Sequence, residues 1–208
     1  MSRRILLVRH GQSTWNALGR WQGWADPPLS ALGEAQAAEA AAQLAVIEPL
    51  AFTSVVASDL QRAQRTAAII SAALGLGAVH TEADLRERNV GEWSGLTRVE
   101  IQARWPEEMA AWIAGRIEAT PGGEPEGAFT DRVVGALVRS AEALPTGDVL
   151  VVSHGGVARA LDRALGVESV PVGNLAGRWY EFDGNGGPVA GSVVNLAAPD
   201  HRTQSPSV

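Results

Sequence analysis

Short runs of β-branched and other apolar residues alternate along this chain with longer alanine-rich segments, and this alternation is typical of an α/β fold. The run 5–8 (ILLV) is apolar throughout, as expected for a central strand that is covered on both faces. Further strands are predicted at 54–57, 78–81, 148–152, 178–182 and 192–196. A glycine-rich turn at 183–187 should join the last two of these strands.

Helices are predicted between the strands, and several of them have recognisable ends. Ser30 is a suitable N-cap for a helix over 31–46. Thr97 and Glu100 have the capping-box spacing, and Pro106 can occupy the first turn of the helix that follows. The other predicted helices are 14–18, 60–73 (capped by residues 58–59), 129–144 and 157–165.

A loop at 121–127, with two prolines and three glycines, is the clearest break in this pattern. We expect it to divide two helices of one domain rather than two domains, because either half of the chain would hold few strands. The 208 residues also fit one domain, since domains mostly contain about 100–200 residues. We therefore predict a single domain over 1–198 with a helical insertion at about 97–127, and a flexible tail at 199–208.

The composition excludes several kinds of chemistry and partner. Without cysteine, the chain has no thiol nucleophile, disulfide or cysteine-bound zinc, and without lysine it has no Schiff base or Walker-type phosphate loop. A formal charge of −6 argues against a nucleic-acid partner. No window approaches the ~20 apolar residues of a membrane span, and the apolar run at the start is too short for a signal peptide. We therefore expect a cytoplasmic protein with no membrane partner, either a monomer or a homodimer.

Two of the predicted strands each end in a histidine followed by a glycine, as His10-Gly11 and His154-Gly155. In open α/β sheets, ligands bind at the carboxyl ends of the strands. Glycine lets the backbone approach a ligand closely, and the helix that follows directs free N–H groups toward it. Arg9 adds a permanent cation, and arginine binds phosphate oxygens in a bidentate manner. The pattern therefore predicts a phosphate site.

The segments around these residues resemble those of the histidine phosphatase superfamily, the phosphoglycerate mutase-like proteins. Five blocks follow one another in the family's order: 7–16 (LVRHGQSTWN), 20–30 (RWQGWADPPLS), 58–67 (SDLQRAQRTA), 85–95 (LRERNVGEWSG) and 153–156 (SHGG). An RHG triplet alone would be weak evidence, but five ordered blocks are strong. The resemblance implies a three-layer α/β/α sandwich with a mostly parallel central sheet.

The resemblance also assigns roles to individual residues. His10 matches the nucleophile that becomes phosphorylated, and Glu87 matches the acid that protonates the leaving oxygen. The remaining basic groups of the phosphate pocket match Arg9, Arg62 and His154. The predicted substrate contacts are Ser13, Asn16, Gln22, Gly23 and Gly155. The implied substrate is a small organic phosphate ester, and no metal or other cofactor is implied.

This chemistry places opposite demands on two side chains. His10 must be neutral to attack phosphorus, and nearby arginines disfavour its imidazolium form. Glu87 must be protonated when the alkoxide departs and must then act as a base toward water. We expect its neighbours Arg86 and Arg88 to point away from it. His154 can stay protonated once a dianionic substrate is bound.

Three functions are compatible with these residues. The first is a metal-independent phosphatase, in which water accepts the phosphoryl group. The second is a cofactor-dependent phosphoglycerate mutase, but family mutases have a tyrosine in place of Val90, a lysine in place of Arg98 and a paired arginine further on. The only arginine pair here is Arg3-Arg4, so a second anionic group on the substrate has no obvious partner. The third is a non-catalytic phospholigand-binding module, which the presence of His10 disfavours. We predict the phosphatase.

Two tryptophan-containing segments, 20–28 and 97–127, are expected to determine which substrate is accepted. They hold Trp21, Trp24, Trp105 and Trp112. Core packing is the preferred interpretation for Trp112, because it lies on an amphipathic helix. Stacking of an apolar or sugar leaving group on the other tryptophans is an alternative hypothesis.

Overall fold

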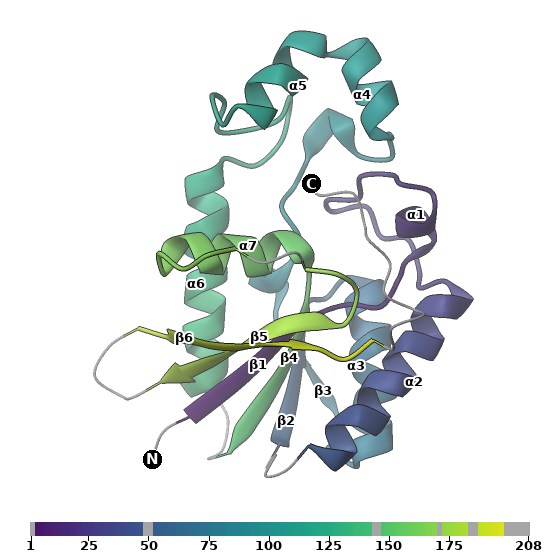
Figure 1. The fold of residues 1–208 in the computed structure, drawn as a ribbon, viewed down its shortest axis with the longest axis vertical. Coiled ribbons are helices and arrows are strands. Elements are labelled where there is room, and N and C mark those ends of the chain that lie inside the picture. The colour runs from purple at the N-terminus through teal and green to yellow at the C-terminus, as the bar shows by residue number, and fades with distance from the viewer. Residues whose placement is uncertain (1–2, 48–51, 143–146, 170–171, 183–186, 198–208) are drawn as a thin grey trace.

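The computed structural model describes residues 3–47, 52–142, 147–169, 172–182 and 187–197, which form a six-stranded sheet with helices on both faces (Figure 1). The strand order is β3-β2-β4-β1-β5-β6. The parallel strands are β1 (Arg3–Arg9), β2 (Phe52–Ala57), β3 (Val79–Thr81) and β4 (Asp148–Ser153). The remaining strands, β5 (Ala176–Phe182) and β6 (Val189–Asn195), form antiparallel pairs β1–β5 and β5–β6. The predicted α/β class with a mostly parallel sheet is confirmed.

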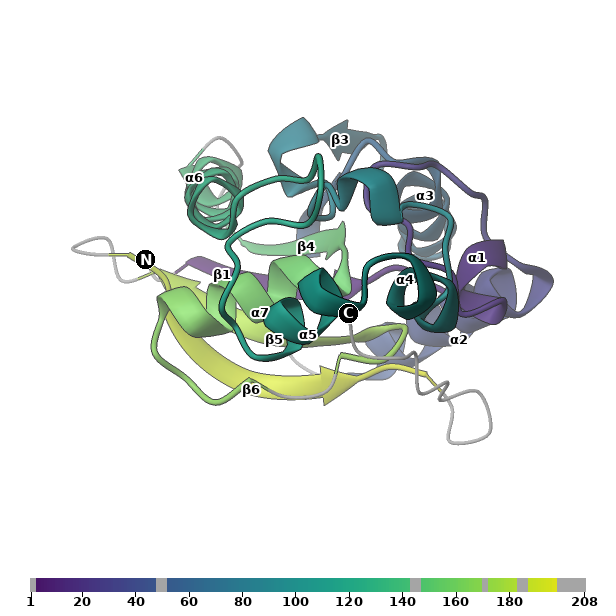
Figure 2. The ribbon, with the colours of Figure 1, turned by 90° about the horizontal axis from the view of Figure 1, so that it is seen from above.

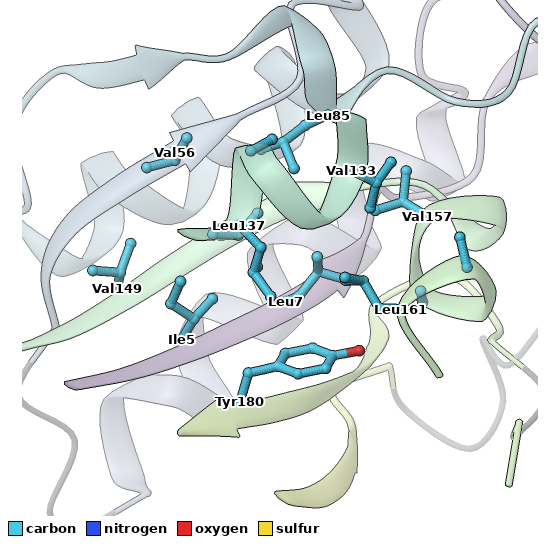
Figure 3. Packing of buried hydrophobic residues seen from close by; sticks show 14 of the residues in the cluster. Ile5, Leu7, Val56, Leu85, Val133, Leu137, Val149, Val157, Leu161 and Tyr180 are labelled. Carbon is cyan, nitrogen blue, oxygen red and sulfur yellow. The ribbon is translucent and has the colours of Figure 1, made fainter. Parts of the chain in front are cut away.

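Alternation along the central strands divides the core into two layers. Leu6 and Val8 of β1 pack with α2 (Ala31–Val46) and α3 (Gln61–Leu74). Ile5 and Leu7 face the opposite way, toward α6 (Glu126–Glu142) and α7 (Gly155–Ala164), as Figure 3 shows. All four of these strand residues are buried. The uniformly apolar run at 5–8 therefore reflects a strand with helices on both sides, which gives the predicted three layers.

A third, smaller cluster of apolar residues lies at the end of the molecule that carries α4 (Arg98–Arg104) and α5 (Pro106–Ile113). Figure 2, which looks from that end, shows both helices in front of the sheet. Trp21 and Trp93 are buried there with ring centroids 5.3 Å apart, and Trp112 packs on both rings. Trp112 therefore contributes to packing, as expected. The other short elements of this region are α1 (Thr14–Ala17), η1 (Ala83–Leu85) and η2 (Gly91–Trp93).

Most element boundaries agree with the sequence, and the exceptions have local causes. Helix α3 begins with Leu60 as its N-cap and no side-chain cap, while the hydroxyl of Ser58 accepts from the Leu60 N–H at 3.4 Å and contacts His154. Helix α7 starts at Gly155, two residues before the predicted start, because the helical backbone continues through both glycines. Helix α6 starts at Glu126, inside the predicted loop. The predicted tail at 199–208 and most of the turn at 183–187 lie outside the described residues.

The remaining predictions concern the domain organisation and a membrane span. The single-domain organisation with an insertion at 97–127 stays a prediction, although α4 and α5 fall within that range. Within the described ranges, no helix has the length and apolar character needed to cross a membrane.

Candidate active site

The register between β1 and β4 brings the two strand-end histidines together. Arg9 pairs with Ser153 in this parallel ladder, so His10 and His154 are the next residues on neighbouring strands. Their ring centroids lie 5.1 Å apart with an interplanar angle of 65°. Both side chains are buried, with His10 2% and His154 0% exposed. Two residues that are 144 positions apart in the sequence thus form one site at the carboxyl edge of the sheet.

The hydrogen bonds around His10 determine which ring nitrogen can react. Its Nδ1 atom lies 2.6 Å from the carbonyl oxygen of Gly11. A carbonyl oxygen only accepts, so Nδ1 carries the proton and Nε2 carries the lone pair. The backbone is held as well, because Asn174 Nδ2 donates to the His10 carbonyl at 2.8 Å and Thr66 Oγ1 accepts from the Gly11 N–H at 3.1 Å. The ring is therefore presented in the tautomer that a nucleophile needs.

Burial and nearby cations keep both histidines neutral. Burial lowers the pKa of His10 well below the usual value, and the guanidinium groups of Arg62 and Arg9 lower it further. The pKa of His154 is also lowered well below its usual value, again first by burial and then by Arg62 and the other basic groups. The neutral state that we expect for His10 agrees with these directions. Without a ligand, His154 is therefore neutral as well. Its protonation requires the negative charge of a bound substrate.

Two buried arginines flank the histidines and are tied to surrounding loops. Arg62, on α3, donates to the carbonyl oxygens of Gly23 at 2.9 Å and Ala25 at 2.8 Å. Arg9 donates to the carbonyl of Val172 at 2.9 Å. Burial lowers the pKa of each guanidinium to about 10, so both remain charged at neutral pH. Each holds a permanent positive charge at a fixed position beside His10.

The carboxylate of Glu87 is held by two backbone N–H groups. Oε2 accepts from Gly156 at 3.1 Å, and Oε1 accepts from Arg88 at 2.8 Å. The guanidinium of Arg86 turns away to a bidentate pair with Asp59, at 2.7 and 2.5 Å. The guanidinium of Arg88 is paired with Glu126. The expectation that both neighbours point away from the Glu87 carboxylate therefore agrees with the structure.

A pocket opens above His10, and some of the predicted site residues line it while others lie behind the lining. Seven of them line it: Arg9, His10, Asn16, Gln22, Gly23, Arg62 and Glu87. Three do not line it: Ser13, His154 and Gly155. Ser13 is fully buried, caps α1 by accepting from the Asn16 N–H at 3.0 Å and donates to Gln22 at 2.8 Å. Which of these residues touch substrate stays a prediction.

The lining also contains cations that the sequence-based interpretation did not anticipate. Six arginines contribute to it: Arg9, Arg20, Arg62, Arg88, Arg159 and Arg163. The expectation that a second anionic group has no obvious partner stays untested, but Arg159 and Arg163 of α7 give the pocket lining two cations that the sequence did not reveal. Val90, at the position of the mutase tyrosine, is buried and also lines the pocket, whereas Arg98 is exposed at the start of α4. Among the described residues, no three histidine or acidic side chains are grouped so as to hold a metal ion.

The family relationship is decided by comparison with known proteins. A family model described as the histidine phosphatase superfamily (branch 1) matches residues 5–186. The chain belongs to this superfamily. The resemblance indicated by the five sequence blocks is thus confirmed.

The relatives that this chain resembles align with most of its length. Glucosyl-3-phosphoglycerate phosphatase of Mycobacterium tuberculosis is 36% identical over 202 residues, which span 90% of this chain and 88% of that protein. The solved structure of mycobacterial glucosyl-3-phosphoglycerate phosphatase matches with a TM-score of 0.73 at 32% identity, over 88% of this chain and 92% of that chain. A 2,3-bisphosphoglycerate-dependent phosphoglycerate mutase of Azorhizobium caulinodans is 39% identical over 172 residues, 79% of this chain and 82% of that protein. This chain is a phosphatase of the histidine phosphatase type.

Several residues of this histidine phosphatase site are not apparent in the sequence. Arg132 of α6 donates to the carbonyl oxygens of Asp84, Arg86 and Glu87 at 2.6, 2.9 and 3.0 Å. Ser58 contacts His154 Nε2 at 2.9 Å. Their sequence context is that of an ordinary helix and a helix cap, so only the chain's long-range contacts reveal them. For Arg159, one signal was available: it lies five residues after His154, near the start of the helix that follows the strand.

Proposed function

We propose that this enzyme hydrolyses small organic phosphate monoesters through a phosphohistidine on His10, with water as the final acceptor. The observation that carries the proposal is the buried, neutral His10, with Nε2 unprotonated, between the guanidinium groups of Arg9 and Arg62. A neutral imidazole can attack phosphorus directly, and the fixed cations can neutralise the phosphoryl oxygens. Two buried atoms of this cluster, Arg62 Nε and His154 Nδ1, have no hydrogen-bond partner among the described residues. Such atoms are expected where a ligand completes the site.

In the first step, Nε2 of His10 forms a bond to phosphorus while the bond from phosphorus to the ester oxygen breaks. The transition state is loose, so alignment and charge stabilisation contribute most of the rate. Glu87 gives its proton to the departing oxygen and the alcohol leaves. The Nδ1–H of His10 keeps its hydrogen bond to the carbonyl of Gly11, which stabilises the positive charge that the ring acquires.

In the second step, water attacks the phosphorus of the phosphohistidine. The Glu87 carboxylate takes a proton from this water, the bond between phosphorus and Nε2 breaks, and His10 returns to its neutral form. Inorganic phosphate is released and Glu87 is again protonated. The ester and one water molecule are thus converted to the alcohol and inorganic phosphate, and His10 and Glu87 return to their starting forms.

The alternative acceptor is a second phosphoglycerate, as in a mutase. The pocket supports water instead, because apolar Val90 lies where family mutases have a tyrosine and Arg98 is outside the pocket lining. The related phosphatase acts on glucosyl-3-phosphoglycerate according to its name, and the substrate class proposed here is the broader one of small organic phosphate esters.

The test is a pair of assays on the purified protein with EDTA present. We expect phosphate release from p-nitrophenyl phosphate to resist the chelator and no conversion of 3-phosphoglycerate to 2-phosphoglycerate. The variant His10→Ala should lose about 10³-fold or more of the turnover. Conversion to 2-phosphoglycerate as the main reaction would support a mutase, and binding of phosphate esters without any turnover would support a non-catalytic module. A substantial rate in His10→Ala would contradict the nucleophile.

We also propose a cytoplasmic location for the enzyme, either as a monomer or as a homodimer. The proposal is supported by the absence of cysteine, since the fold does not depend on an oxidising compartment. Cell fractionation would test the location, and light scattering after size-exclusion chromatography would distinguish the two assemblies.

A further inference from the structure

One arginine of the pocket lining, Arg159, differs from the other five in having no hydrogen-bond or ion-pair partner among the described residues. Arg159 and Arg163 lie one turn apart on α7, so both side chains reach the same side of that helix. Arg163 is paired with Glu126, and so is Arg88 across the pocket. For Arg159, no hydrogen bond or ion pair is formed with any residue that the structure describes. The Arg159 guanidinium is thus available at the pocket wall.

The position of Arg159 makes this lack of a partner unfavourable without a ligand. A β-carbon built on Gly155 would lie 3.5 Å from Nη1 of Arg159 and 3.5 Å from Cδ of Arg9, so the two arginine side chains lie close to each other. Burial lowers the pKa of Arg159, and the charge of Arg163 lowers it further. A partly buried cation beside other cations is stabilised when an anion binds. The site therefore favours a negatively charged group of the ligand.

The side of the pocket on which Arg159 lies indicates which part of the substrate this group belongs to. Glu87 is the strongest favourable electrostatic neighbour of Arg159, and Glu87 is the proposed acid for the ester oxygen. Its carboxylate is held at the first turn of α7, the helix that carries Arg159. Arg159 and Glu87 both line the pocket, so Arg159 lies on the wall that also presents the proposed acid to the ester oxygen.

We propose that Arg159 is a specificity-determining residue that binds a carboxylate of the leaving group, and that the preferred substrates are phosphate esters with a carboxylate a few bonds from the ester oxygen. A guanidinium and a carboxylate match in a bidentate pair. Arg159 is the one arginine of the pocket lining without a partner among the described residues, so a carboxylate suits the position better than a second phosphoryl group with its larger charge. The inference rests on the proposed function, since it assumes that the phosphoryl group occupies the site at His10.

The experiment compares two substrates that differ at one group, 3-phosphoglycerate with its carboxylate and sn-glycerol 3-phosphate with a hydroxymethyl in its place. We expect the wild-type enzyme to prefer the carboxylate. The variant Arg159→Gln should lower kcat/KM for 3-phosphoglycerate by about tenfold or more and for glycerol phosphate by less than about threefold. For 3-phosphoglycerate, the kcat/KM of Arg159→Lys should fall between those of the wild-type enzyme and Arg159→Gln, because lysine keeps the charge and loses the planar fork.

The control is Arg139→Gln, on the surface of α6, where the arginine is half exposed and pairs with Glu82 and Asp84. It should leave the ratio of the two kcat/KM values unchanged. An equal loss on both substrates in Arg159→Gln would overturn the inference, because Arg159 would then act on the phosphoryl group or on folding. A wild-type enzyme that hydrolyses p-nitrophenyl phosphate and gains nothing from the carboxylate would also overturn it, while leaving the proposed function intact. Failure on every ester would count against the proposed function itself.

Discussion

The Oγ atom of Ser58 lies 2.9 Å from Nε2 of His154, and this contact joins the ends of two neighbouring strands. Ser58 directly follows β2 and His154 directly follows β4. Both side chains are completely buried. The orientation of the His154 ring therefore depends on a residue from a different part of the chain, which itself does not line the pocket.

Removing the Ser58 hydroxyl should lower activity without abolishing it. In Ser58→Ala, His154 Nε2 loses its buried partner, at a cost of roughly 1 kcal/mol, so we expect kcat to fall about three- to tenfold with a smaller change in KM. Steady-state kinetics on p-nitrophenyl phosphate measures this. The matched control is Ser71→Ala, which removes a buried serine at the far end of α3 whose hydroxyl bonds the Gly77 carbonyl. Equal effects of the two variants on kcat would contradict a role for Ser58 in orienting His154.

Arg132 should affect the reaction through the position of Glu87. Its guanidinium donates to the carbonyls of Asp84, Arg86 and Glu87. The guanidinium is itself held by the Glu124 carboxylate at 2.7 and 2.8 Å. In Arg132→Gln we expect kcat/KM for an alkyl phosphate, which reports formation of the phosphohistidine, to fall about 10²-fold, since an alkoxide needs the acid. With 2,4-dinitrophenyl phosphate, whose leaving group needs no proton, the loss in kcat/KM should stay below about threefold. Glu87→Gln should show the same dependence on the leaving group, and a uniform loss in Arg132→Gln would show that the arginine only supports folding.

Gly156 should be intolerant of a side chain for a reason specific to the site. A β-carbon at this position would overlap Oε1 of Glu87, whereas a β-carbon at Gly127 would meet nothing within 4 Å. Gly156→Ala is therefore expected to displace the carboxylate and lower kcat about tenfold or more on alkyl phosphates. Gly127→Ala, near the start of α6, should be neutral or slightly stabilising, because alanine favours helix over glycine by roughly 0.5–1 kcal/mol. A fully active Gly156→Ala would show that Glu87 can act from another position.

The parts of the fold that were predictable depend on local rules. The N-cap at Ser30 and the capping box at Thr97 are decided by residues within one turn, and both occur as predicted. The meeting of His10 and His154 was predictable because parallel strands end at one edge of a sheet. The start of a helix at glycine was less predictable, since glycine permits helix and loop alike. For this reason the start of α7 at Gly155 was not predicted.

The supporting residues of the site were not predictable from local rules. Ser58 has the sequence context of a helix cap, and its contact with His154 spans 96 positions. Arg132 resembles a solvent-exposed helix residue, and its partners are backbone carbonyls 45 to 48 positions away. Backbone carbonyls carry no signature in the sequence, so contacts of this kind need the tertiary structure.

The two buried histidines should also make folding stability depend on pH. The pKa of each is lowered in the folded protein, so below about pH 6.5 the unfolded chain takes up protons that the folded protein does not. The stability that the folded protein gains from keeping these histidines neutral is fully present above this pH and is lost as the pH falls. Together the two residues can account for at most about 3 kcal/mol of the decrease in unfolding free energy between pH 7.5 and 5.5. Urea denaturation at both pH values measures it, and the double variant His10→Gln with His154→Gln should lose this part of the decrease. The same decrease in the double variant would place the pH dependence in other groups.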